Sequence, residues 1–210
     1  MRNATQVRLT TGKLVTLAEL TPAEMLTALR GSGSGSGMSA LVEGRMSALR
    51  MSIREIDGAA VGLVNLFGGL WDTRFSARET MQLQRAFSTM HDAEPGEVAK
   101  ILAAAPASTG KRQVIDAKIG DTTYTMNELG YGLVQASMSA GDKEAAPAAL
   151  EYAVALDGVR RSLSAIDGVA FTAPAEWPVP CKDTAMLAAI WRELHGFGSD
   201  ERPTVVPTTA

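Results

Sequence analysis

This sequence contains few of the residues that carry covalent cross-links or most catalytic chemistry: its 210 residues include one cysteine, two histidines and 5% aromatic residues. Because Cys181 is alone, an intramolecular disulfide framework and a multi-cysteine zinc or iron–sulfur site are excluded. A membrane span needs roughly 20 apolar residues, and the most apolar stretch, residues 58–71, is shorter and contains Asn65. The first residues lack the apolar core of a secretory signal, so we expect a soluble protein of a reducing cytoplasm.

What is present is typical of a globular chain. Hydrophobic residues make up 46% and charged residues 20%, with a formal net charge of −3, which excludes a disordered chain. Twenty glycines and nine prolines follow no triplet period, so a collagen-like chain is excluded too. A pI near 5.5 argues against nucleic-acid binding as the main task.

Local signals in the first half predict a hairpin and then a helix. Two short alternating apolar runs flank Thr11 and Gly12, which predicts a β-hairpin. Thr21 and Glu24 form a capping-box pattern, with Pro22 at the first helical position, and this predicts a helix start.

An apolar stripe at steps of four and three residues then occurs twice, 110 residues apart. The first stripe comprises Val42, Met46, Leu49, Ile53 and Ile56, and the second comprises Tyr152, Leu156, Val159, Leu163 and Ile166. This spacing places each set on one face of a helix. Each stripe is followed by Asp-Gly, at Asp57 and Asp167, where we expect the helix to end.

Identities around these Asp-Gly pairs indicate an internal repeat. Gly120 and Asp121 predict a second hairpin, before a helical stretch over residues 126–140. The identical pairs are Arg50 and Arg160, Ser52 and Ser162, Ile56 and Ile166, Asp57 and Asp167, Gly58 and Gly168, and Ala60 and Ala170. The sequence therefore predicts an α+β fold, mostly helical, with two similar modules that each have a β-hairpin followed by about three helices.

The repeat also sets the expected boundaries. We expect a first module over residues 1–105, a linker over 106–111, a second module over 112–197 and a flexible tail over 198–210. The Gly/Ser run at residues 31–37 falls inside the first module as a loop, and its natural or engineered origin stays open.

The residues that could carry catalysis lack a recognisable constellation, and we predict no catalytic, cofactor-binding or metal-binding residues. His91 and His195 each lie near a helix end, where a cationic imidazole would suit the helix dipole. Lys182 could lower the pKa of Cys181, but an ordinary thiol is the expectation. Asp57 and Asp167 are interpreted as turn residues.

Partner contact is the role that the scarce aromatics suggest. Trp71, Trp177 and Trp191 are the candidates, because tryptophan is enriched at interface hot spots. Packing in the core of each module is the alternative interpretation.

Three segments resemble a known family. They are residues 7–17 (VRLTTGKLVTL), residues 20–25 (LTPAEM) and residues 75–87 (FSARETMQLQRAF). Together they resemble the tail assembly chaperones and baseplate-hub assembly proteins of contractile-tailed bacteriophages. The resemblance covers roughly residues 5–100 and, through the repeat, 112–195; the duplication departs from the single-unit chaperones.

The resemblance implies a non-enzymatic tail or baseplate assembly factor, or a minor structural virion protein, without cofactors. Its partners would be tail-tube, tape-measure or hub proteins, met in the host cytoplasm during assembly; retention in the virion tail and the oligomeric state stay open. One alternative is a small-molecule-binding or enzymatic domain with a site at the pseudo-symmetric junction, around Asp57 and Asp167. A second is a nucleic-acid-associated virion protein. The arginines it would use are Arg45, Arg50, Arg54, Arg160 and Arg161.

Overall fold

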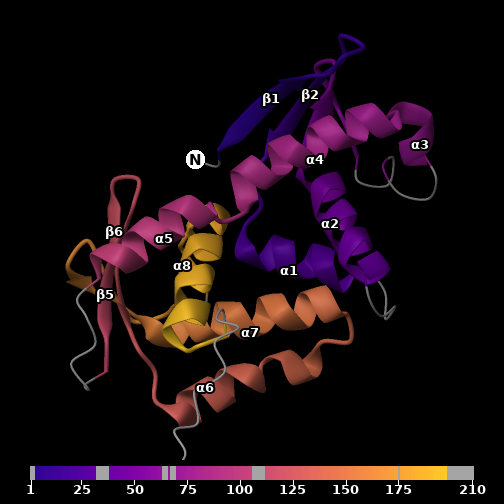
Figure 1. The fold of residues 1–210 in the computed structure, drawn as a ribbon. Helices are drawn as coiled ribbons and strands as arrows, with labels where there is room; N and C mark the ends of the chain where they lie inside the picture. Colours follow the sequence, from indigo (N-terminus) through magenta and orange to yellow (C-terminus); the bar gives the residue numbers. More distant parts are fainter. Residues whose placement is uncertain are drawn as a thin grey trace, which may run out of the picture.

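The structure, a computed structural model, describes residues 3–31, 38–62, 66, 70–105, 112–174 and 176–197. It confirms the α+β class and the two similar modules. Each module has a four-stranded antiparallel sheet, in the order β1-β2-β3-β4 or β5-β6-β7-β8, and the two sheets lie well apart in the molecule (Figure 1). The expected linker, the tail and most of the Gly/Ser loop lie outside the described residues.

The modules repeat one order of elements. The first contains β1 (Ala4–Arg8), β2 (Leu14–Ala18), α1 (Pro22–Arg30), α2 (Met38–Ser52), β3 (Ile53–Ile56), β4 (Ala59–Ala60), α3 (Leu70–Arg74) and α4 (Ala77–His91), and α5 (Pro95–Ala104) follows it. The second contains β5 (Val114–Ile119), β6 (Thr122–Asn127), α6 (Tyr131–Met138), the short 3-10 helix η2 (Gly141–Lys143), α7 (Pro147–Ser162), β7 (Leu163–Ile166), β8 (Val169–Ala170) and α8 (Cys181–Leu194).

The predicted helix start at Thr21 is confirmed. The Thr21 hydroxyl accepts the Glu24 amide at 3.2 Å, and the Glu24 carboxylate accepts the Thr21 amide at 2.8 Å. A second capping box opens α4, where Ser76 and Glu79 exchange the same two bonds at 3.3 and 2.8 Å. Each box satisfies amides that a helix N-terminus otherwise leaves unpaired.

The predicted helix ends at Asp-Gly are wrong. The helices end earlier, at Ser52 and Ser162, and the residues that follow form β3 and β7. Asp57 and Gly58 have φ of 52° and 77°, the two left-handed positions of a tight hairpin turn. Ile53 pairs with Leu17 of β2. Pairing with this strand therefore makes Ile53 and the residues after it a strand, although their apolar spacing fits a helix. Likewise, β6 extends into the expected helix over residues 126–140, and α6 begins later.

The equivalent residues of the two modules follow from these elements. They are 110 residues apart between α2 and α7, 109 apart between α1 and α6, and 104 apart between α4 and α8. The spacing between equivalent residues falls from 110 to 104 after the β3–β4 turn. The connection from this turn to α4 is therefore six residues longer than the connection from the β7–β8 turn to α8.

Each module has its own buried core, but the cores share elements. The first core includes Ala146 and Ala149 near the start of α7, and Cys181 at the start of α8. The second core includes Val98 of α5. So α5, which precedes the boundary expected at residue 105, packs against the second module, and α7 completes the first. Helices α1, α7 and α6 lie one beneath the other (Figure 1).

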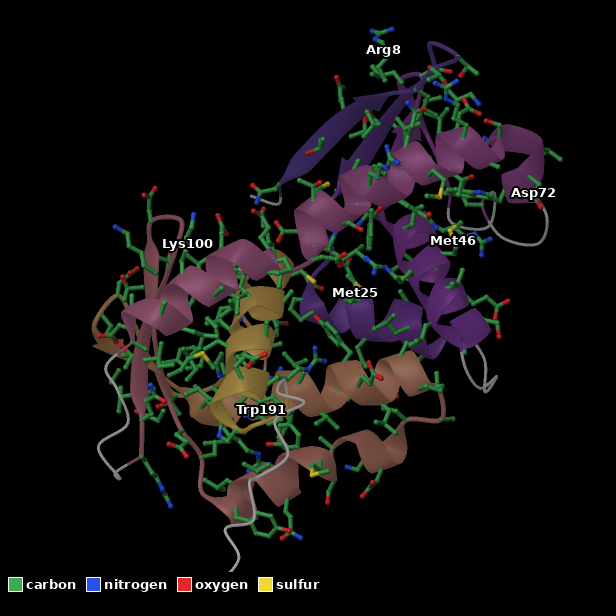
Figure 2. All side chains as sticks on the ribbon, in the orientation of Figure 1. Arg8, Met25, Met46, Asp72, Lys100 and Trp191 are labelled. Carbon is green, nitrogen blue, oxygen red and sulfur yellow. The ribbon has the colours of Figure 1, made fainter. Side chains whose placement is uncertain are left out.

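Close packing of α7 on α8 depends on Gly158. A Cβ at this position would lie 2.3 Å from the Trp191 ring, and Trp191 lies where α8 meets α7 (Figure 2).

Gly158→Ala should lower the free energy of unfolding by about 1–3 kcal/mol, because the buried Trp191 ring must move to make room for the added methyl group. Gly132 of α6, whose added Cβ would meet nothing within 4 Å, is the matched control; Gly132→Ala should leave stability equal or raise it by up to ~1 kcal/mol. Urea unfolding of both variants measures this, and an equal effect of the two would contradict the packing argument.

Candidate functional site

Two histidines occupy equivalent positions at the ends of α4 and α8. His91 Nε2 accepts the Leu20 amide at 2.9 Å, and His195 Nε2 accepts the Leu129 amide at 2.8 Å. Each Nδ1 lies beside the carbonyl oxygen four residues earlier, Phe87 at 2.9 Å or Trp191 at 2.7 Å. Because a backbone amide can only donate, Nε2 is the acceptor, and Nδ1 carries the proton and donates it to the carbonyl.

These imidazoles are therefore structural clamps that tie the end of a helix to the segment just after a strand. His91 is buried, and burial holds its pKa below the usual 6.5, although its bond to Phe87 and the charges of Glu19 and Asp92 oppose the shift. The expectation of a cationic imidazole at the helix end is wrong for His91, because burial favours the neutral ring. The repeat of the clamp was missed because the histidines are 104, not 110, residues apart.

Two of the tryptophans are also equivalent. Trp71 Nε1 donates to Thr80 at 2.9 Å, and Trp177 Nε1 donates to Thr184 at 2.8 Å. Thr80 and Thr184 are equivalent positions of α4 and α8.

The rings lie mostly inside their own modules. Trp71 and Trp191 are buried in the first and second core, and Trp177 is half-buried against the second. Arg160 lies 5.5 Å from the centre of the Trp177 ring. Contact of these tryptophans with a partner stays a prediction, and of the three, Trp177 has the most surface left to offer.

Asp57 and Asp167 are not brought together. Each is exposed at the turn of its own sheet, where its carboxylate accepts a strand amide, from Leu14 at 2.7 Å and from Thr123 at 2.8 Å. The alternative that placed a site around this pair thus loses the pairing on which it depended.

Cys181 is enclosed where the modules meet. Its Sγ lies 3.7 Å from the Tyr152 hydroxyl, and burial raises the pKa of the thiol to about 12. Lys182 does not activate it, because the Lys182 ammonium binds Glu94 at 2.8 Å. A neutral buried thiol is a poor nucleophile.

The arginines considered for nucleic-acid binding are engaged with neighbouring side chains. Arg45 binds Asp92, Arg54 lies 3.9 Å from Glu24, and Arg161 binds Asp157 at 2.5 Å. Arg50 and Arg160 lie over the Trp71 and Trp177 rings. These contacts spread the cations over both modules instead of along one groove.

A hollow of about 320 Å³ lies at the junction of the modules. Its walls are helices of both modules: α1, α2 and α4 on one side, α7 and α8 on the other. The side chains are mostly apolar or small, including Met25, Leu29, Phe87, Tyr152 and Ala188, and Met25 points from α1 toward α4 (Figure 2). The hollow therefore offers apolar contact, and Arg45, His91, Asp92, Glu151 and Arg192 also line it.

Arg30 of α1 reaches across the junction. Its guanidinium binds the Glu144 carboxylate through two bonds, at 2.8 and 2.6 Å. This bidentate pair holds α1 against the segment that precedes α7.

Comparison with known protein families, curated proteins and solved structures finds no match. In the described ranges, no three histidine, cysteine, aspartate or glutamate side chains gather in a way that could hold a metal ion. None of the helices in those ranges has the length and apolar character that crossing a membrane requires.

The His91 clamp predicts a pH-dependent stability. The unfolded chain takes up a proton as the pH falls through about 6.5, whereas folded His91 resists it, so stability falls with the pH from about 6.5 downward. His91→Gln keeps an acceptor in place of Nε2 but does not titrate, and should lose this part of the pH dependence.

Urea unfolding of the parent protein and of His91→Gln at pH 7.5 and 5.5 tests this pH dependence. Carboxylates titrate in both proteins, so their contribution cancels when the two changes in unfolding free energy are subtracted. His91→Ala should cost about 1–3 kcal/mol at pH 7.5, because the Leu20 amide is left buried without an acceptor. An unchanged pH dependence in His91→Gln would contradict the clamp.

Proposed function

We propose that this protein is a non-enzymatic phage tail or baseplate assembly factor, or a minor structural virion protein, that acts by binding other tail polypeptides. The observation that supports it best is that, within the described ranges, one end of each sheet is a strand that pairs on one side only, β1 or β5. An open strand edge can take an extended polypeptide as an additional strand.

The outward groups of β1 follow from its pairing with β2. The Glu19 amide donates to Asn3 at 2.8 Å, and the Leu9 amide donates to Lys13 at 2.8 Å. Since inward and outward residues alternate along an antiparallel strand, the amides and carbonyls of Ala4, Gln6 and Arg8 point away from β2.

β5 repeats this arrangement in the second module. The Glu128 amide donates to the Gln113 carbonyl at 2.8 Å, which places Val114, Asp116 and Lys118 at the outward positions by the same alternation. Val114 is an exposed apolar side chain, so this edge offers both main-chain bonds and apolar contact.

The resemblance to tail assembly proteins falls on the same part of the molecule. Residues 7–17 form most of the β1–β2 hairpin, residues 20–25 begin α1, and residues 75–87 form most of α4. The segments that carry the resemblance thus build the first open sheet and helices of its module. Recognition through main-chain bonds suits an assembly factor, because it depends little on the partner's exact sequence.

Co-expression with tail-tube, tape-measure and hub proteins encoded beside this chain tests the function. A stable complex with at least one of them is expected, and no binding to any of them would overturn the proposal. Mass spectrometry of purified particles then distinguishes a virion component from a transient chaperone.

Proline at outward positions tests the binding mode. Gln6→Pro and Lys118→Pro each remove an outward amide without removing a bond within the sheet, as edge strands tolerate. If strand addition carries binding, the variant of the edge that is used should bind at least about tenfold more weakly, roughly 1.4 kcal/mol.

Gln6→Thr, which keeps the amide, is the matched control and should bind like the parent protein in calorimetry. Full affinity in a double variant, Gln6→Pro with Lys118→Pro, would rule out both edges.

A further inference from the structure

The two modules meet through unlike surfaces. The first module contributes the hollow between α1, α2 and α4, and the second module covers it with α7 and α8. The two equivalent helices α1 and α6 therefore have different surroundings. Helix α1 lies against α7 of the other module, whereas α6 lies at the outer side of α7 (Figure 1). A junction of this kind can be repeated at its free ends.

The second module carries the same hollow without a cover. A cavity of about 590 Å³ lies between α6, α7 and α8. Its lining includes Met138 and Trp191, the equivalents of Leu29 and Phe87 in the covered hollow. Leu150, Val154, Ala155 and Phe197 are the other apolar residues of its lining.

Exposure confirms that this hollow is open. Leu29 is 7% exposed, whereas Met138 is 50% exposed. Phe197, which also lines this hollow, is 49% exposed, whereas the Trp191 ring at its base is buried. Leu150, also in the open hollow, is exposed too.

The first module carries a free face that matches the cover. Val42 of α2 and Met81 of α4 are 51% and 52% exposed, and they are the exposed large apolar side chains of the first module among the described residues. Their equivalents in the second module are Tyr152 and Ala185, and both line the covered hollow. The first module thus presents Val42 and Met81 at two positions of the cover, whereas Arg45, Gln84 and Arg85 stand at the equivalents of the covering residues Ala155, Ala188 and Ala189.

We propose that the open hollow of the second module binds the Val42–Met81 face of a second copy of this chain. The contact repeats the internal junction between chains, with α2 and α4 of one copy in the role that α7 and α8 have within the chain. Because hollow and face lie on different modules, association is head to tail and gives a ring or an open filament.

A second copy is the occupant because the two open apolar surfaces are the equivalents of the two sides of a junction that the chain already forms. Four of the exposed large apolar side chains in the described helices belong to these two surfaces: Val42, Met81, Met138 and Leu150. No tail protein is needed for this association, so its test is independent of the proposed function.

Sedimentation velocity of the purified full chain over a range of concentrations measures the association. The parent protein should form concentration-dependent species larger than one chain. Met81→Asp blocks the face and Met138→Asp blocks the hollow, and each variant alone should sediment as a single chain, because a charge would be buried without a partner.

Mixing the two variants gives the decisive measurement. Met81→Asp keeps its hollow and Met138→Asp keeps its face, so an equimolar mixture should form a species of two chains and none larger. A symmetric interface that used one patch twice would not be restored by mixing.

Val169→Asp, at an exposed apolar position of β8, is the matched control and should associate like the parent. If either aspartate variant fails to fold by circular dichroism, Val42→Asp replaces the first or Leu150→Asp replaces the second. Three results would each overturn the proposal. The parent protein stays a single chain at all concentrations, Met81→Asp and Met138→Asp still associate when each is alone, or their mixture stays monomeric.

Discussion

The packing of α7 and α8 against the first module is the constraint on which the rest of the molecule depends. Ala149 and Cys181 belong to the core of the first module although they come from the second half of the chain. Small residues at such positions let helices approach closely, and Gly158 allows the same between α7 and α8. Neither module is therefore a closed unit, and burial of this junction decides which surfaces remain free.

Within each module, a histidine and a tryptophan hold the last helix, α4 or α8, to the rest of the module. The histidine accepts an amide just after a strand and the tryptophan donates to a threonine of the helix, with nearly the same distances in both modules. The ring nitrogens of these side chains are thus used in hydrogen bonds within the fold. The two proposals rest on other parts of the molecule, namely the β1 and β5 edges, the open hollow and the Val42–Met81 face. Strand addition at the edges and head-to-tail association of helices use different surfaces, so the two proposals are compatible.

The sequence alone determined whatever depends on neighbours along the chain. The hairpins at Gly12 and Gly120 and the capping box at Thr21 follow from turn and cap chemistry within a few residues, and the repeat of the module follows from matching residues in the two halves. The absence of a catalytic constellation was also visible at this level as an expectation, and it stays one.

Only the tertiary structure decided the rest, because distant parts of the chain compete with local preference. Ile53 and Ile56 fit a helix by spacing, yet pairing with β2 makes them a strand. His91 is neutral because the protein buries it, which no local pattern reports. The placement of α5 on the second module and the open state of one of two equivalent hollows both depend on how the two copies pack. A repeated sequence specifies two similar surfaces, and asymmetric packing decides which of them stays open.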